Sequence, residues 1–122
     1  MKTGITYTSN TTVTTQNTAL SLGSGDMDVF ATPALVALME NAAMLAVKDE
    51  LPQGSTTVGA WIETSHIKPS ALGEKISATA VLKEIEGRKL TFHISAQDSK
   101  GVIGEGKHIR YIVDRERFLS KL

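Results

Sequence analysis

Residues 33–47 read PALVALMENAAMLAV, a run in which only Glu40 and Asn41 are polar. Thr32 immediately precedes this run. Because threonine is a favoured N-cap and proline is favoured in the first helical position, the sequence predicts a helix that starts here. A helix lying on a sheet normally keeps a wide polar face. This one is apolar nearly all round, so we expect it to be buried nearly all round, partly by a sheet and partly by a second copy of the chain.

The rest of the chain has the patterns of strands and turns. The alternation of apolar and polar residues is clearest over 90–97 and is typical of a half-buried strand. Residues 21–28 contain two glycines and predict a loop, and 114–122 predict a terminal helical turn or a tail. Strands are predicted over 5–19, 57–67, 75–85, 90–97 and 102–113. The order of strand, long helix and antiparallel meander indicates one α+β domain over residues 1–122.

The overall composition excludes several classes of function. Lysine and arginine together number 13, as do aspartate and glutamate, so the formal net charge is zero and we expect neither a nucleic-acid nor a membrane partner. The absence of cysteine excludes disulfides and cysteine nucleophiles, and it fits a reducing compartment. The sequence has neither an apolar signal segment nor a run of about 18 apolar residues, so the predicted location is cytoplasmic.

Glu40 is unusual because it lies in the middle of the apolar helix. A carboxylate is costly to bury without a partner, and burial raises a carboxyl pKa toward values useful in a general base. Thr32 lies eight residues earlier. On a helix the two are offset by about 80° and about 12 Å, so both can line one groove. The alternative is that Glu40 and Asn41 form a narrow solvated stripe and that Thr32 is only a cap.

His66 is the best candidate among the three histidines for proton transfer. It ends the predicted strand 57–67 on the same face as several apolar residues, although a single histidine there is more often structural than catalytic. His93 falls on the polar face of its strand and His108 lies among charged residues, so both are weaker candidates. No two histidines have the spacing of metal ligands and no glycine-rich phosphate loop is present, so we expect no metal and no cofactor.

Gly59 and Arg110 are candidates for contact with a substrate. A glycine inside a strand often marks a bulge or the close approach of a ligand, and a sheet bend beneath the helix explains Gly59 equally well. Arg110 lies between Ile109 and Tyr111 in the last predicted strand. A surface ion pair explains this arginine as well as a contact with coenzyme A does.

The chain resembles the fluoroacetyl-CoA thioesterase family and its hotdog relatives over about residues 29–118. The resemblance lies in VFATPALVALME (29–40), Gly59, TSH (64–66), EGRKL (86–90) and IGEGKHIR (103–110). It implies the hotdog fold, in which one long central helix is wrapped by a curved antiparallel sheet and the chain forms a homodimer, with a tetramer as a further option. It also implies that Thr32, Glu40 and His66 are catalytic and that Gly59 and Arg110 contact the substrate.

This resemblance implies an enzyme that hydrolyses an acyl-CoA thioester to a free acid and CoA. Fluoroacetyl-specific members have an aromatic-rich lid before the helix, whereas this chain has Gly25-Asp26-Met27-Asp28, so we expect a short or medium acyl group instead. Glu40 activates water or attacks the carbonyl itself, and Thr32 holds the substrate or water or is itself the nucleophile. The alternatives are an acyl-CoA-binding hotdog protein without turnover, a hotdog enoyl-CoA hydratase or dehydratase, and a purely structural dimer.

Overall fold

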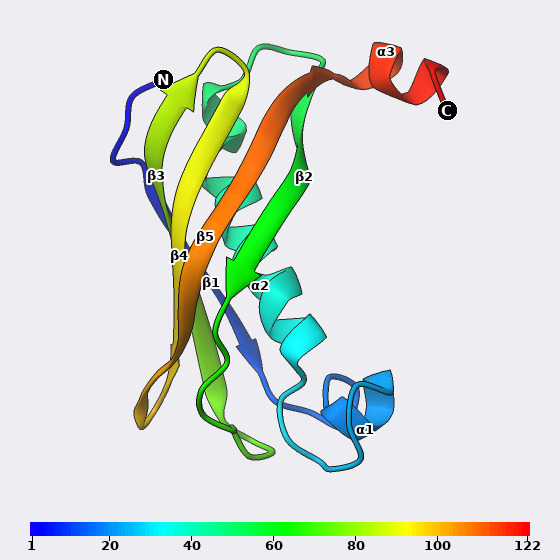
Figure 1. Ribbon diagram of the computed structural model, residues 1–122, viewed down its shortest axis with the longest axis vertical. Coiled ribbons are helices and arrows are strands. Elements are labelled where there is room, and N and C mark those ends of the chain that lie inside the picture. The colour runs from blue at the N-terminus through cyan, green and yellow to red at the C-terminus, as the bar shows by residue number, and fades with distance from the viewer.

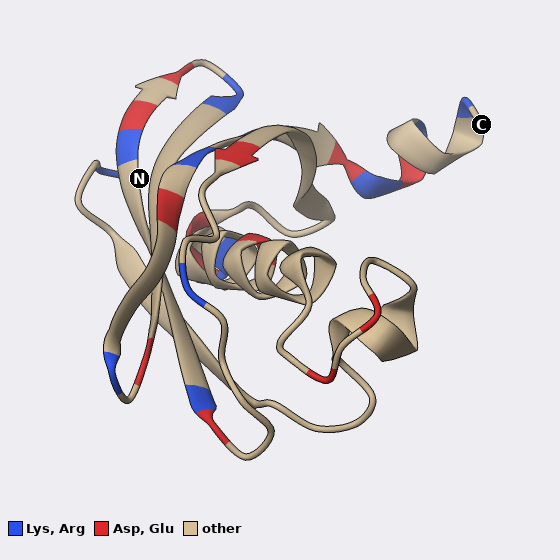
Figure 2. Ribbon diagram, turned by 60° about the horizontal axis from the view of Figure 1, so that its bottom comes forward, with Lys and Arg blue, Asp and Glu red and all other residues tan.

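The computed structural model describes residues 1–122 and consists of one five-stranded antiparallel sheet curved around a long helix, α2 (Thr32–Val47) (Figure 1). The strand order is β1-β3-β4-β5-β2. Viewed nearly along α2, the sheet curls around one side of the helix and leaves the other side open (Figure 2). The strands are β1 (Thr6–Thr12), β2 (Ser55–Thr64), β3 (Lys75–Glu86), β4 (Lys89–Asp98) and β5 (Gly101–Asp114). The shorter elements are α1 (Ala19–Leu22), the 3-10 turn η1 (Lys48–Glu50) and α3 (Arg115–Ser120).

Helix α2 begins one residue earlier than predicted. Its N-cap is Ala31, which has no side chain that can accept a hydrogen bond, so the prediction of Thr32 as the N-cap is wrong. Thr32 instead occupies the first helical turn next to Pro33, and its hydroxyl is free to bond elsewhere. The helix ends where the chain tightens into η1.

One face of α2 supplies the centre of the core. The helix residues of this core are Leu35, Met39, Ala42, Ala43 and Val47, a spacing that places them on one side of a helix. They pack against the inward-facing residues of the sheet, which include Ile76, Ala78, Ala80, Leu82, Leu90, Phe92, Ile94 and Ile103. The alternation predicted for residues 90–97 is therefore confirmed, with His93 exposed on the outer face.

The opposite face of α2 is not covered within one chain. Pro33 and Ala37 are exposed, and Val36 and Leu45 are only half-buried, so the prediction that the helix is buried nearly all round does not hold for a single chain. The open side lies next to β2, which is an edge strand of the sheet. An apolar helix face beside an unpaired strand edge is the arrangement that a further chain can complete.

Two strands end three or more residues before their predicted bounds, and the other three strands agree to within one residue at each end. The strand predicted over 5–19 ends at Thr12, because Thr14 and Asn17 form a turn in which the Asn17 side chain accepts from the backbone N–H of Thr14 (2.9 Å). The strand predicted over 57–67 ends at Thr64, so His66 lies beyond it. No helix of the structure is both long enough and apolar enough to cross a membrane.

Candidate active site

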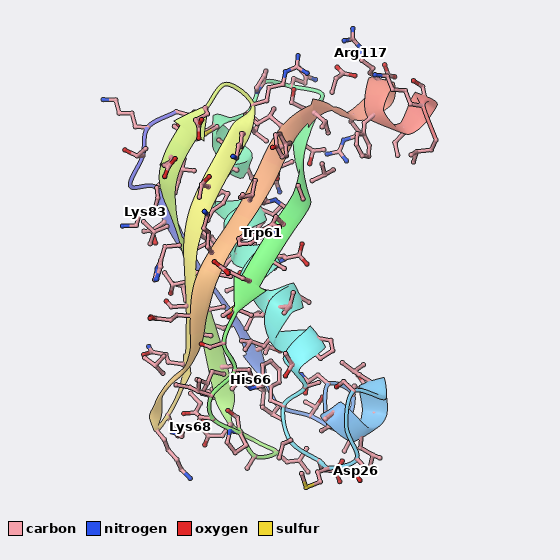
Figure 3. The ribbon with its side chains drawn as sticks, in the orientation of Figure 1. Asp26, Trp61, His66, Lys68, Lys83 and Arg117 are labelled. Atoms are coloured by element: carbon pink, nitrogen blue, oxygen red, sulfur yellow. The ribbon has the colours of Figure 1, made fainter.

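The start of α2 brings two of the predicted catalytic residues together. The hydroxyl of Thr32 lies 2.7 Å from Nδ1 of His66, and we call these two residues the helix-start pair. Figure 3 shows His66 beneath the end of β2 and near the start of α2. Nε2 of His66 is buried without a hydrogen-bond partner, and Phe30 meets the imidazole edge to face at 6.4 Å between ring centroids. Burial lowers the pKa of His66 from its usual value, which favours the neutral ring.

Two glycines of β5 determine where His66 lies. A Cβ at Gly104 would collide with the backbone carbonyl of Ser65, and a Cβ at Gly106 would collide with that of Glu63. The segment leading to His66 therefore lies directly on β5, and the N–H of Ser65 donates to the carbonyl of Glu105 (3.0 Å). The Gly104-Glu105-Gly106 pattern is itself a signal of this arrangement, because paired glycines in a strand indicate close backbone approach.

A cavity of about 250 Å³ adjoins the helix-start pair. Its walls come from α1, from the start of α2 and from the segment after His66, and they combine apolar with polar side chains. The lining residues are Ala19, Ser24, Val29, Phe30, Thr32, His66, Ile67, Lys68 and Pro69. A neutral histidine that can exchange a proton with a hydroxyl therefore faces a space large enough for a small ligand.

Further along α2 lies a second group, Glu40, Gly59, His108 and Arg110, which we call the Glu40 cluster. Oε2 of Glu40 lies 3.7 Å from Nη1 of Arg110 and 4.0 Å from Nε2 of His108. A Cβ added to Gly59 would lie only 2.6 Å from the same carboxylate oxygen. Gly59 also precedes a β-bulge between Gly59 and Trp61. The bulge expected at this glycine is therefore present, and the group that approaches Gly59 within the chain is the carboxylate of Glu40.

Arg110 is a buried cation, so its explanation as a surface ion pair is wrong. Its side chain is 8% exposed, and it donates from Nε to the hydroxyl of Thr57 (2.8 Å) and from Nη2 to the carbonyl of Thr57 (3.0 Å). Burial lowers the pKa of Arg110 from its usual value, and the carboxylate of Glu40 partly opposes that shift. The inward position follows from alternation along β5, because Arg110 shares a face with His108.

The two groups are not in contact within one chain. Thr32 and Glu40 are separated by two turns of α2, or about 12 Å along its axis. The histidine beside Glu40 is His108, one of the weaker candidates from sequence, and not His66. The side chain of Glu40 is 40% exposed, so one chain alone does not form the water-free environment that was expected. No cluster of three or more histidine, aspartate or glutamate side chains has the geometry of a metal site.

Comparisons with known proteins agree with this architecture. The family model described as fluoroacetyl-CoA-specific thioesterase matches residues 13–116. A fluoroacetyl-CoA thioesterase from Streptantibioticus cattleyicolor is 36% identical over 95 residues, which cover 78% of this chain and 68% of that relative. The crystal structure of a point mutant of the fluoroacetyl-CoA-specific thioesterase matches with a TM-score of 0.92 and 31% identity, covering 99% of this chain and 94% of the other.

More distant structures show the fold alone. A thioesterase superfamily member from Thermus thermophilus has a TM-score of 0.91 at 23% identity, covering 98% of this chain and 89% of the other. A hot-dog-like protein from Thermanaerovibrio acidaminovorans has a TM-score of 0.90 at 21% identity, covering 99% and 90%. The predicted hotdog fold and the predicted family resemblance are both confirmed.

Proposed function

This chain belongs to the fluoroacetyl-CoA-specific thioesterase family, and on that premise we propose that it hydrolyses a short or medium acyl-CoA to a free acid and CoA. The observation that carries the proposal is the 2.7 Å contact between Thr32 and His66 beside a cavity, in a chain that also has Glu40 next to a buried arginine. These are the groups that hydrolysis of a thioester requires: a base or nucleophile, a proton carrier and a cation near the developing negative charge.

The working enzyme in this proposal is a homodimer whose active site combines both groups. Within a chain the helix-start pair and the Glu40 cluster are too far apart to act on one carbonyl. A second chain that covers the open face of α2 and the free edge of β2 would bury apolar surface. By two-fold symmetry the helix-start pair of the second chain would approach the Glu40 cluster of the first chain. The helix-start pair of the first chain would approach the Glu40 cluster of the second chain in the same way. Such packing would exclude water from Glu40.

The proposed reaction begins with attack on the thioester carbonyl carbon. Glu40 removes a proton from the attacking water or attacks the carbonyl itself, and Thr32 holds the water or substrate or acts as the nucleophile. Negative charge then develops on the carbonyl oxygen. In this proposal the guanidinium of Arg110, 3.7 Å from Glu40, and the backbone N–H of Gly59 stabilise that charge. One donor of this kind contributes about 3 kcal/mol to transition-state stabilisation in known enzymes.

Proton transfer completes the turnover. Burial lowers the pKa of His66, which favours the neutral ring, and His66 is hydrogen-bonded to Thr32, so it can accept and return a proton as the tetrahedral intermediate collapses. The thiolate of CoA is a stable anion, so its departure needs less help from an acid than departure of an amine would. We propose that the acyl chain lies in the cavity beside the helix-start pair, against Phe30 and Ile67.

Release of free thiol from a panel of acetyl-, butyryl-, hexanoyl- and enoyl-CoA tests the function. The expected result is thiol release that saturates with substrate and falls at least about a hundredfold in Glu40→Gln. His93→Gln is the matched control, because His93 is exposed on the outer face of the sheet and should keep full activity. A change in enoyl absorbance without free thiol would identify a hydratase. Binding without either signal would identify a carrier.

A mixed dimer tests the shared site. Thr32→Ala and Glu40→Gln chains with different affinity tags would be co-expressed, and the mixed dimer isolated on both tags. If each site takes Thr32 from one chain and Glu40 from the other, one site of the mixed dimer is intact and about half of the wild-type activity returns. If each chain forms its own site, both sites carry a defect and no activity returns.

A further inference from the structure

His108 is almost fully buried, and both of its ring nitrogens have a partner. Its exposed fraction is 1%, and it lies on β5 with its ring against that of Phe92, at 6.3 Å between centroids. Nδ1 is 2.8 Å from the backbone carbonyl of Trp61, and Nε2 is 3.2 Å from Nη1 of Arg110. A carbonyl can only accept a hydrogen bond and a guanidinium can only donate one. Nδ1 must therefore carry the hydrogen and Nε2 must present its lone pair, which defines a neutral ring in a single tautomer.

We propose that His108 is a positioning residue of the thioesterase site, which fixes the guanidinium of Arg110 through Nε2 and the bulge of β2 through Nδ1–H. This inference rests on the proposed function for its catalytic meaning. The hydrogen-bond assignment itself does not depend on the reaction.

The first part of the inference concerns Arg110. A guanidinium has five N–H groups. Two of them, on Nε and Nη2, donate to Thr57, and one on Nη1 donates to His108. The remaining N–H of Nη1 is on the nitrogen 3.7 Å from the carboxylate of Glu40. His108 and Thr57 together thus hold the guanidinium from two sides, which leaves one N–H on Nη1 and one on Nη2, the former for Glu40 or for a substrate oxygen.

The second part concerns the bulge that follows Gly59. Gly59 pairs with Arg110 and Trp61 pairs with Ile109, so Ala60 is the extra residue of β2. A bulge interrupts the ladder of backbone hydrogen bonds and leaves backbone N–H and C=O groups without a partner on the neighbouring strand. The Nδ1–H of His108 donates to the carbonyl of Trp61, directly after the extra residue. The side chain thus fixes the bend that places Gly59 beside Glu40.

His108 is unsuited to proton transfer, which separates its role from that of His66. Burial lowers the pKa of His108 and the charge of Arg110 lowers it further, while the carbonyl of Trp61 and the carboxylate of Glu40 act in the opposite direction. Taking up a proton at Nε2 would replace the hydrogen bond from Arg110 by repulsion between two cations. The 4.0 Å approach of Glu40 to Nε2 is therefore a contact with a neutral ring and not an ion pair.

Three substitutions separate the two hydrogen bonds. His108→Gln places an amide oxygen near the position of Nε2 and can still accept from Arg110. His108→Asn places an amide nitrogen near the position of Nδ1 and can still donate to Trp61. His108→Phe fills the space and does neither. We expect His108→Phe to lower kcat about a hundredfold while KM changes less than about threefold, because the groups it frees act mainly in the transition state.

Partial rescue distinguishes positioning from a purely structural role. His108→Gln and His108→Asn should each recover at least about tenfold of the kcat lost in His108→Phe, since each keeps one of the two hydrogen bonds. His93→Gln, on the exposed face of β4, should leave kcat unchanged. A folded His108→Phe dimer with wild-type kcat would overturn the proposal. The proposal would also be overturned if His108→Phe, His108→Gln and His108→Asn had equal kcat values and equal losses of thermal stability.

A measurement on the wild-type protein covers the case in which the variants do not fold. Nitrogen-15 NMR of labelled histidine side chains reports which ring nitrogen carries the hydrogen. His108 should show a protonated Nδ1 and an unprotonated Nε2 at neutral pH, and the opposite tautomer or a cationic ring would refute the assignment. If the wild-type protein released no thiol from any acyl-CoA, the proposed function would fail while this tautomer could still be found.

Discussion

Replacing Gly59 by alanine should disable the enzyme with little effect on its fold. The new Cβ would lie 2.6 Å from Oε2 of Glu40, and ordinary contact begins at 3.4 Å, so the carboxylate must retreat by about 0.8 Å. The atom that has to move is the end of a flexible side chain that is 40% exposed, so the stability cost is small. The new Cβ would also lie 3.3 Å from Nη1 of Arg110 and from Cε1 of His108, which restricts the retreat toward these groups.

The expected loss of activity follows from that displacement. A misplacement of about 1 Å in a reacting group costs about a hundredfold in rate, so kcat for thiol release should fall by about that factor. The melting temperature should stay within about 3 °C of the wild-type value. For a chain of this size, that shift corresponds to a change of less than about 1 kcal/mol in the free energy of unfolding. Steady-state thiol release and a thermal melt on the same preparation measure both quantities.

A double mutant shows whether the loss acts through Glu40. In a Glu40→Ala background no carboxylate remains to be displaced, so adding Gly59→Ala should lower kcat little further. Wild-type kcat in Gly59→Ala, or fully multiplicative losses in the double mutant, would refute the reasoning.

Three further predictions concern the core and the helix-start pair. Leu35→Ala should lower the free energy of unfolding by about 2–5 kcal/mol, since Leu35 is fully buried, and an unchanged urea midpoint would contradict this. Gly104→Ala should lower kcat and should lower the free energy of unfolding by about 1–3 kcal/mol, because the new Cβ meets the rigid backbone carbonyl of Ser65. A variant with wild-type kcat and wild-type stability would disprove this prediction. The free energy of unfolding should fall as pH drops below about 6.5. Burial lowers the pKa of His66 and of His108 in the folded chain, so the unfolded chain takes up protons first. The same urea midpoint at about pH 7.5 and at about pH 5.5 would count against this prediction.

The fold could be predicted largely from local patterns. The apolar run over residues 33–47 predicts α2, and alternation predicts β3, β4 and β5 to within one or two residues. The error at the first strand has a local cause: the turn at Thr14 and Asn17 lies within a threonine-rich stretch that otherwise favours an extended chain.

The site could be predicted less completely, because it depends on contacts between residues distant in sequence. The sequence predicts Thr32 both as the helix cap and as a catalytic residue, but nothing local shows that its hydroxyl bonds to His66. His108 was given a low rank because its sequence neighbours are charged. Alternation, however, places it on the inner face with Arg110 and could have indicated a buried pair. Helix geometry separates Glu40 from Thr32 by about 12 Å, and the apolar helix predicts a second chain, but local patterns do not show how that chain would be placed.

If a second chain covers the free edge of β2, as proposed, protein concentration becomes a variable in any assay. Glu40 lies beside this edge, so loss of the neighbouring chain would expose the acid to water and remove the proposed threonine and histidine in one step. Specific activity should then decrease when the enzyme is diluted below the dissociation constant of the dimer, although each chain remains folded. On the proposed dimer, a cell that makes little of this protein would have fewer active sites than chains.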